Sequence, residues 1–178
     1  MTAAQRSAAD PAASVWVTAS AGTGKTKVLT DRVLRLLLGG SEPGRILCLT
    51  FTRAAAAEMA IRITGTLGQW TAATDEILDM ALRELLERAP EDAEFRRARM
   101  LFAEVLDTPG GMKILTIHAF CQSLLRRFPL EAGVAPHFAV ADERTARELL
   151  NEAQNRLLRH ARQGEDEPLA AALAAITA

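Results

Sequence analysis

Apolar residues occur along most of this chain in two patterns, as short continuous runs and as longer stretches with helical spacing. Three short β-prone runs predict strands at Ser14–Thr18, Arg45–Phe51 and Lys113–Ile117. The second run is apolar at nearly every position, which is typical of a strand buried on both faces of a parallel sheet. Because strands alternate with helical segments, the chain predicts an α/β domain with a mainly parallel sheet.

The segments between and after these runs predict amphipathic helices. One helix is expected from Lys25 to Leu38, where two glycines end it. A long helical excursion covers about residues 53–107, and Asp142 offers an N-cap to a final helical stretch. The expected apolar faces are Leu29, Val33, Leu36 and Leu37; Met59, Ile63, Leu67 and Trp70; Leu78, Leu82 and Leu85; Phe95, Ala98, Phe102 and Val105; Phe120, Leu124 and Phe128; and Ala146, Leu150, Ala153 and Leu157.

A glycine-rich segment, ASAGTGKT, lies between the first predicted strand and the first long helix. This is the setting of a phosphate-binding loop, whose glycines let backbone N–H groups approach a phosphate without a Cβ in the way. Lys25 can reach the β- and γ-phosphates, and the Thr26 hydroxyl can ligate Mg²⁺. An ordinary turn has no need of a cation at a helix start, where the dipole disfavours one. We therefore predict a site for ATP and Mg²⁺ formed by Ala19, Ser20, Ala21, Gly22, Thr23, Gly24, Lys25 and Thr26.

Composition excludes several classes of protein. Apolar residues make up 49% of the 178 residues and the formal net charge is −1, so a packed core is expected and coating of nucleic acid by bulk charge is not. No apolar run is long enough to cross a membrane, and the N-terminus lacks the pattern of a secretory signal. Cys48 and Cys121 lie far apart among apolar residues, which favours a place in the core over zinc binding or catalysis.

Three further segments narrow the prediction. Gln5-Arg6 precede the phosphate loop, TFTRAAAAEM (Thr50–Met59) leaves the second predicted strand, and TIHAFC (Thr116–Cys121) leaves the third. In this order they resemble the beginning of superfamily 1 DNA helicases of the UvrD/Rep/RecB type. Within that family they are most similar to the AddA group of helicase–nuclease subunits. The resemblance covers about residues 5–150.

This resemblance implies a fold and an activity. The fold is a RecA-like P-loop NTPase, a parallel sheet flanked by helices, with motor domain 1A over residues 1–141 and the start of a helical subdomain, 1B, over residues 142–178. The activity is ATP-dependent DNA unwinding in the 3′ to 5′ direction, in recombinational repair of double-strand breaks. The implied partners are single- and double-stranded DNA and an AddB-like protein, and the implied location is the bacterial cytoplasm.

The resemblance also implies roles for residues outside the loop. Gln5 matches the glutamine that reads the adenine edge, a role suited to an amide because it both donates and accepts hydrogen bonds. Phe51 matches an aromatic that stacks on DNA bases, although its position also fits the last core residue of a strand. Arg53-Ala54 stand where many relatives have Asn-Lys, which shifts or removes a cation. The residues implied to contact DNA are Thr50, Phe51, Thr52, Arg53, Thr116 and His118.

Two interpretations stay open for the remaining basic residues. The clusters Arg96-Arg97-Arg99 and Arg126-Arg127 could line a DNA path, but solvated helix faces explain them better. His118 in its apolar stretch fits a structural residue as well as a contact to the DNA backbone.

ATP hydrolysis also needs carboxylates that bind the metal and activate water. No predicted strand ends in two adjacent carboxylates, and Asp142-Glu143 has the position of a helix cap. We therefore expect the first part of a longer helicase, with an incomplete sheet, that neither hydrolyses ATP nor unwinds DNA by itself. The alternatives are a non-catalytic nucleotide-binding module, which the missing carboxylates favour, and a small-molecule P-loop kinase, for which no arginine-rich lid or acceptor module is visible.

Overall fold

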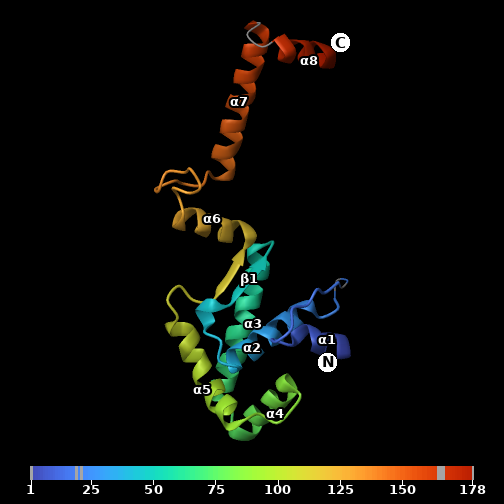
Figure 1. Ribbon diagram of the computed structural model, residues 1–178, viewed down its shortest axis with the longest axis vertical. Coiled ribbons are helices and arrows are strands. Elements are labelled where there is room, and N and C mark those ends of the chain that lie inside the picture. Colours follow the sequence, from blue (N-terminus) through green and yellow to red (C-terminus); the bar gives the residue numbers. More distant parts are fainter. Residues whose placement is uncertain (1, 19, 21, 164–166, 178) are drawn as a thin grey trace. The chain divides into compact units, whose positions relative to one another are not determined.

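The computed structural model describes residues 2–18, 20, 22–163 and 167–177 (Figure 1). The chain forms two compact units, residues 1–125 and residues 126–178. The domain boundary predicted after residue 141 stays a prediction. The described elements are α1 (Ala3–Ala9), α2 (Lys25–Leu38), the 3₁₀ turn η1 (Pro43–Arg45), β1 (Leu47–Thr50), α3 (Arg53–Ala72), α4 (Asp75–Leu86), α5 (Asp92–Asp107), β2 (Lys113–Thr116), α6 (Ile117–Arg127), α7 (Glu143–Gln163) and α8 (Glu167–Thr177).

Helices α2, α3, α4 and α5 of the first unit pack around one apolar core. The apolar faces predicted for α3 and α4 are confirmed, since every residue predicted to lie on them is buried. On α5 the prediction omitted Leu101, which is fully buried, while Phe95 and Phe102 pack at the margin of the core. Burial of a leucine-sized side chain contributes about 1.5–3 kcal/mol, so this helical cluster is the main source of stability in the unit.

The predicted bounds of α2 are confirmed, but its predicted apolar face is partly wrong. Val33 and Leu37 are buried as expected, whereas Leu29 is 52% exposed. Leu34 and Leu38 are buried in the same core. The helix is apolar around much of its circumference, so spacing alone did not determine which side faces α3 and α5.

Strands β1 and β2 are parallel and form a two-stranded sheet, with Leu47 paired to Lys113 and Thr50 to Thr116. One face of the sheet packs Cys48 and Ile114 against the helical core. On the other face Leu47 and Leu49 are each 45% exposed. The prediction that β1 is buried on both faces is therefore wrong for this structure, because the helices of the core cover a single face.

The segment Ser14–Thr18 is not a strand, contrary to the prediction. Trp16 is 94% exposed and Val17 is 51% exposed. A β-prone run becomes a strand only when a neighbour accepts its backbone hydrogen bonds, and among the described residues β1 and β2 pair with each other alone. The α/β class is confirmed, although the described chain is mostly helical with a small parallel sheet.

Two of the arginines considered for a DNA path join helices instead. Arg99 Nη1 donates to the carbonyl oxygens of Trp70 at 2.8 Å and Ala73 at 2.6 Å, where α3 ends. Its Nη2 donates to Asp75 Oδ1 at 2.6 Å, where α4 begins. Arg97 Nε donates to the Leu37 carbonyl oxygen at 2.6 Å near the end of α2. These bonds satisfy carbonyl groups that helix ends leave unpaired.

Replacing Arg99 by methionine is expected to lower the free energy of unfolding of this chain by about 2–3 kcal/mol, since charge-assisted bonds to helix-end carbonyls are lost. Urea unfolding followed by far-ultraviolet circular dichroism measures the change. The matched control is Arg96→Met, because Arg96 is exposed on the same helix and should tolerate the change within about 0.5 kcal/mol. Equal losses in both variants would contradict this role of Arg99.

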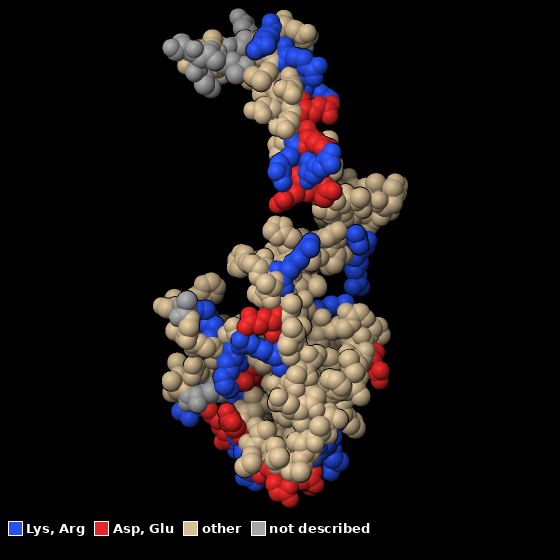
Figure 2. Space-filling model, turned by 180° about the vertical axis from the view of Figure 1, so that it is seen from behind, with Lys and Arg blue, Asp and Glu red and all other residues tan. Residues whose placement is uncertain are grey.

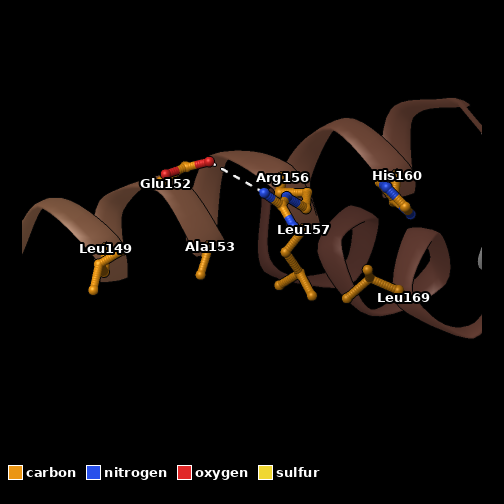
Figure 3. Close-up of a pocket in the computed structure, with 7 residues that line it drawn as sticks. All are labelled: Leu149, Glu152, Ala153, Arg156, Leu157, His160 and Leu169. Atoms are coloured by element: carbon orange, nitrogen blue, oxygen red, sulfur yellow. Dashed lines mark hydrogen bonds and ion pairs between the residues drawn. The ribbon is translucent and has the colours of Figure 1, made fainter. Parts of the chain in front are cut away.

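The second unit contains α7 and α8, which confirms the helical prediction for the described part of this region. Asp142 caps α7 as expected, because its Oδ1 accepts a hydrogen bond from the Thr145 amide at 2.7 Å. This bond lowers the pKa of the Asp142 carboxyl. Leu149 and Leu157 of α7 and Leu169 of α8 line a hollow between the two helices, as Figure 3 shows.

Acidic and basic side chains are mixed along α7 up to Glu152, and the charged residues after it are arginines. Figure 2 shows acidic and basic side chains side by side along this helix. They correspond to ion pairs one turn apart: Arg147–Glu143, Arg144–Glu148 and Arg156–Glu152. Such exposed pairs contribute little to stability, and Arg159 and Arg162 beyond them give α7 more basic than acidic side chains.

The two cysteines differ in their surroundings. Cys48 is half-buried beside the core, and burial raises the pKa of its thiol, which fits the predicted core position. Cys121 is exposed on α6, so its predicted place in the core is wrong. The reason is that α6 fully buries none of its residues in this structure. Within the described chain, no helix combines the length and the apolar character needed to span a bilayer.

Candidate functional site

The glycine-rich segment forms a tight turn into α2. Gly22 and Gly24 have φ angles of +79° and +81°, in the left-handed region that side chains rarely adopt. Gly24 is the N-cap of α2, so the first amides of the helix face the turn without a side-chain cap. Amides at a helix N-terminus, together with the positive end of the helix dipole, favour an anion at this position. Two loop residues of the predicted site, Ala19 and Ala21, lie outside the described residues.

Lys25, the first residue of α2, lies over this turn. Its Nζ donates to the Ser20 carbonyl oxygen at 2.5 Å, and Thr23 Oγ1 donates to the same oxygen at 2.8 Å. The ammonium group is therefore held beside the loop rather than extended into solvent. Thr26 follows in the first turn of α2 and is half-buried. The turn thus brings together an ammonium, a hydroxyl and a helix N-terminus, a combination that can bind a polyphosphate.

Gln5 lies against the same turn although it is far away in sequence. Its Nε2 donates to the Thr23 carbonyl oxygen at 3.3 Å, and its Oε1 accepts from the Thr2 amide at 2.9 Å in a capping box of α1. A Cβ at Gly24 would lie 3.5 Å from Gln5 Nε2. The structure therefore places the amide of Gln5 at the phosphate loop, in hydrogen-bond contact with it.

A cavity of about 740 Å³ lies beside α1 and the turn. Gln5, Thr23 and Lys25 supply polar groups to its wall, and Val17 and Leu29 supply apolar surface. Small-molecule sites in proteins commonly combine a concave apolar wall with a few convergent polar groups in this size range. The cavity can therefore hold the base and sugar of a ligand whose phosphates occupy the turn.

Arg32 lines the same cavity, and the sequence pattern did not single it out. A signal for it was present, since Arg32 lies two helical turns after Lys25 and so shares its side of α2. Its partners are carbonyl groups about 20 residues earlier in the chain, which no local pattern identifies.

The predicted DNA-contact residues lie together at the C-terminal ends of β1 and β2. Thr50 and Thr116 are the last residues of the two strands and lie in register. Phe51 follows β1 and is 88% exposed, so the core alternative for this residue is wrong here. Thr52 caps α3, where its Oγ1 accepts from the Ala55 amide at 3.1 Å. An exposed aromatic beside hydroxyl groups can stack on a base while the hydroxyls bind phosphate.

The other two predicted contacts lie in the first turns of α3 and α6. Arg53 begins α3 and is exposed. His118 is exposed in the first turn of α6, close to Thr116, whose Oγ1 accepts from the Ala119 amide at 3.2 Å. Both side chains are therefore accessible at the same edge of the sheet.

The structure brings the site residues together in two groups. One is the phosphate turn with Gln5, and the other is the pair of strand ends with Thr50 and Thr116. The predicted strand Ser14–Thr18 would join the groups within one sheet, but it is unpaired. Among the described residues, no three His, Cys, Asp or Glu side chains lie close enough together to hold a metal ion.

Comparison with known proteins agrees with this geometry. The family model of the UvrD/REP helicase N-terminal domain matches residues 1–175. The chain is 38% identical over 135 residues to the A subunit of the ATP-dependent helicase/nuclease of Pelotomaculum thermopropionicum. The matched residues cover 74% of this chain and 9% of that protein. It is 35% identical over 143 residues to the protein of the same name from Lactobacillus gasseri, covering 80% of this chain and 10% of that protein.

A third relative is the corresponding protein from Anoxybacillus flavithermus, 34% identical over 155 residues, which covers 85% of this chain and 11% of that protein. The predicted resemblance to AddA-type proteins is thereby confirmed. The chain spans only about a tenth of the length of these curated relatives.

Proposed function

This chain belongs to the family of UvrD/REP helicase N-terminal domains, and from this premise we propose that it binds ATP as the N-terminal motor segment of an ATP-dependent DNA helicase. The observation that carries the proposal is the turn at Gly22 and Gly24, where the Lys25 ammonium lies beside the N-terminus of α2. A phosphate tail in this turn would meet a cation and a helix N-terminus together.

The proposed ligand is ATP with Mg²⁺. Because the described residues offer no carboxylate cluster, the ion would be held by the nucleotide phosphates and by the Thr26 hydroxyl. Mg²⁺ would neutralise phosphate charge there. Ala19, Ser20, Ala21 and Thr23 would contribute backbone groups around the phosphates, and Gln5 would read the adenine edge.

The second part of the proposal concerns DNA. Phe51 would stack on a base of single-stranded DNA, since its ring is exposed at the end of β1. Thr50, Thr52, Arg53, Thr116 and His118 would contact the backbone around it. Their common position at one sheet edge supports this role.

A third part of the proposal concerns the process in which the full-length protein acts. By similarity to the A subunits of helicase/nucleases, we place it in recombinational double-strand break repair in the bacterial cytoplasm, with 3′ to 5′ movement on DNA and an AddB-like partner. The chain by itself would bind nucleotide without hydrolysing it, because no predicted strand of its sequence ends in the two adjacent carboxylates that hydrolysis needs.

An ATPase assay separates these parts of the proposal. Titration of this chain with ATP in the presence of Mg²⁺ should show binding, and turnover with single-stranded DNA should appear only in the full-length protein. ATP turnover by the chain alone would contradict the proposal that hydrolysis needs the full-length protein. Phosphoryl transfer to a metabolite would favour the kinase alternative.

Replacing Gln5 by alanine is expected to weaken ATP binding about tenfold and to reduce the preference for ATP over GTP, because one amide that recognises adenine is lost. Equilibrium titration with both nucleotides measures the effect. Inorganic tripolyphosphate, which has no base, is the internal control, and its affinity should not change. An equal loss for tripolyphosphate would contradict base reading by Gln5.

A further inference from the structure

We infer that Arg32 is a positioning residue for adenine recognition, which holds α1, and with it Gln5, against the helix that follows the phosphate loop. This inference rests on the proposed function, because it assumes that Gln5 reads the base of a nucleotide bound at that loop. Arg32 would act through α1 and not through contact with the ligand.

The guanidinium of Arg32 binds three backbone carbonyl groups at the end of α1 and just beyond it. Its Nη1 donates to the Ala8 carbonyl oxygen at 3.2 Å and also to that of Asp10, which is the C-cap of α1. Its Nη2 donates to the Ala13 carbonyl oxygen at 2.7 Å. A cation at a helix C-terminus satisfies unpaired carbonyl groups and complements the negative end of the helix dipole.

Helix α1 depends on such a contact because its other contacts with the described residues are weak. It has seven residues, too few for a stable helix in isolation. Its apolar contact with α2 consists of Ala8 and Ala9 against Val28, which buries only small groups. The ion pair between Arg6 and Glu87, at 3.6 Å, is largely exposed and therefore weak. Arg32 thus supplies the strongest described polar contact between α1 and the rest of the unit.

Gln5 is one helical turn before Ala8, so fixing the end of α1 also fixes the amide of Gln5. Among the described residues of the loop, that amide contacts Thr23, with a hydrogen bond from Nε2 to the carbonyl oxygen at 3.3 Å. Arg32 and Gln5 line the same cavity. Both terminal nitrogens of Arg32 donate to carbonyl groups at the end of α1 or just beyond it, and this favours an indirect role over contact with a nucleotide.

The test compares ligands with and without a base. Arg32→Met keeps an apolar stem and removes the guanidinium, and its affinity for ATP, GTP and inorganic tripolyphosphate is measured by equilibrium titration of this chain. We expect ATP binding to weaken about tenfold and the preference for ATP over GTP to fall. Tripolyphosphate binding should stay within about twofold of wild type. An equal loss for all three ligands would show a general structural role and overturn the inference.

A matched control and a double variant sharpen the result. Arg6→Met removes the same charge from the neighbourhood of α1 and should change ATP affinity by less than about twofold. If Arg32 acts through Gln5, the double variant Gln5→Ala/Arg32→Met should bind ATP as Gln5→Ala does. Additive losses would point to direct contact with the ligand and overturn the indirect role.

Two further measurements keep the outcomes distinct. If Arg32→Met lowers the melting temperature to the assay range, Arg32→Lys replaces it in the test, because lysine keeps the positive charge and one donor nitrogen. We expect this variant to lose less ATP selectivity than Arg32→Met and to bind tripolyphosphate as wild type does. An unchanged ATP selectivity would overturn the inference. Failure of the wild-type chain to bind tripolyphosphate or ATP would refute the proposed function itself. If the wild-type chain binds both ATP and tripolyphosphate and Arg32→Met keeps the normal preference for ATP, the inference about Arg32 is refuted and the proposed function is not.

Discussion

Replacing Lys25 by alanine is expected to weaken ATP binding to this chain at least about tenfold. The ammonium group lies beside the phosphate turn, where it donates to the Ser20 carbonyl oxygen at 2.5 Å. A charge-assisted hydrogen bond contributes about 1.5–3 kcal/mol, and Lys25 can offer more than one to the β- and γ-phosphates. Removing the side chain leaves the backbone amides at the N-terminus of α2 in place, so binding should fall without disappearing.

Titration with ATP and Mg²⁺ measures this loss, and circular dichroism verifies that α2 is intact. Lys113→Ala is the matched control, because it removes an identical charge at the start of β2. Its ATP affinity should equal that of wild type. Unchanged ATP binding in Lys25→Ala would refute the assignment of the phosphate loop.

Replacing Phe51 by alanine in the full-length protein is expected to weaken binding of single-stranded DNA and to leave ATP affinity unchanged. The ring is 88% exposed at the end of β1, so its removal costs the core little. Stacking on one base contributes about 1–3 kcal/mol, which corresponds to about fivefold to a hundredfold in affinity.

Fluorescence anisotropy with a labelled oligonucleotide at fixed salt measures this change. Phe51→Trp keeps an aromatic face and should retain binding, whereas Phe51→Leu keeps apolar volume and should lose it. Parallel losses of DNA and ATP binding in Phe51→Ala would instead indicate that the residue supports the fold of the domain.

The register of the two strands explains how distant motifs form one candidate DNA surface. Thr50 and Thr116 are far apart in sequence, yet they face each other because β1 and β2 are parallel and end together. The carboxyl ends of parallel strands are where such sheets bind ligands. Any movement of this edge would therefore act on Phe51 and His118 together.

The sequence by itself determined the features that depend on neighbouring residues. Glycines at positions 22 and 24 predicted a turn with positive φ, and the structure has it, because only a residue without a Cβ adopts this conformation at little cost. The bounds of α2, the buried faces of α3 and α4 and the cap at Asp142 also followed from local spacing and capping chemistry.

Tertiary structure decided what depends on a distant partner. Ser14–Thr18 has the composition of a strand but remains unpaired, and β1 is covered on one face only, since pairing and coverage require another segment at the right place. Likewise, Arg99 and Arg32 looked like ordinary charges until the fold brought helix-end carbonyl groups within reach of their guanidinium groups. Local conformation is encoded residue by residue, whereas these contacts exist only after helices distant in sequence have packed together.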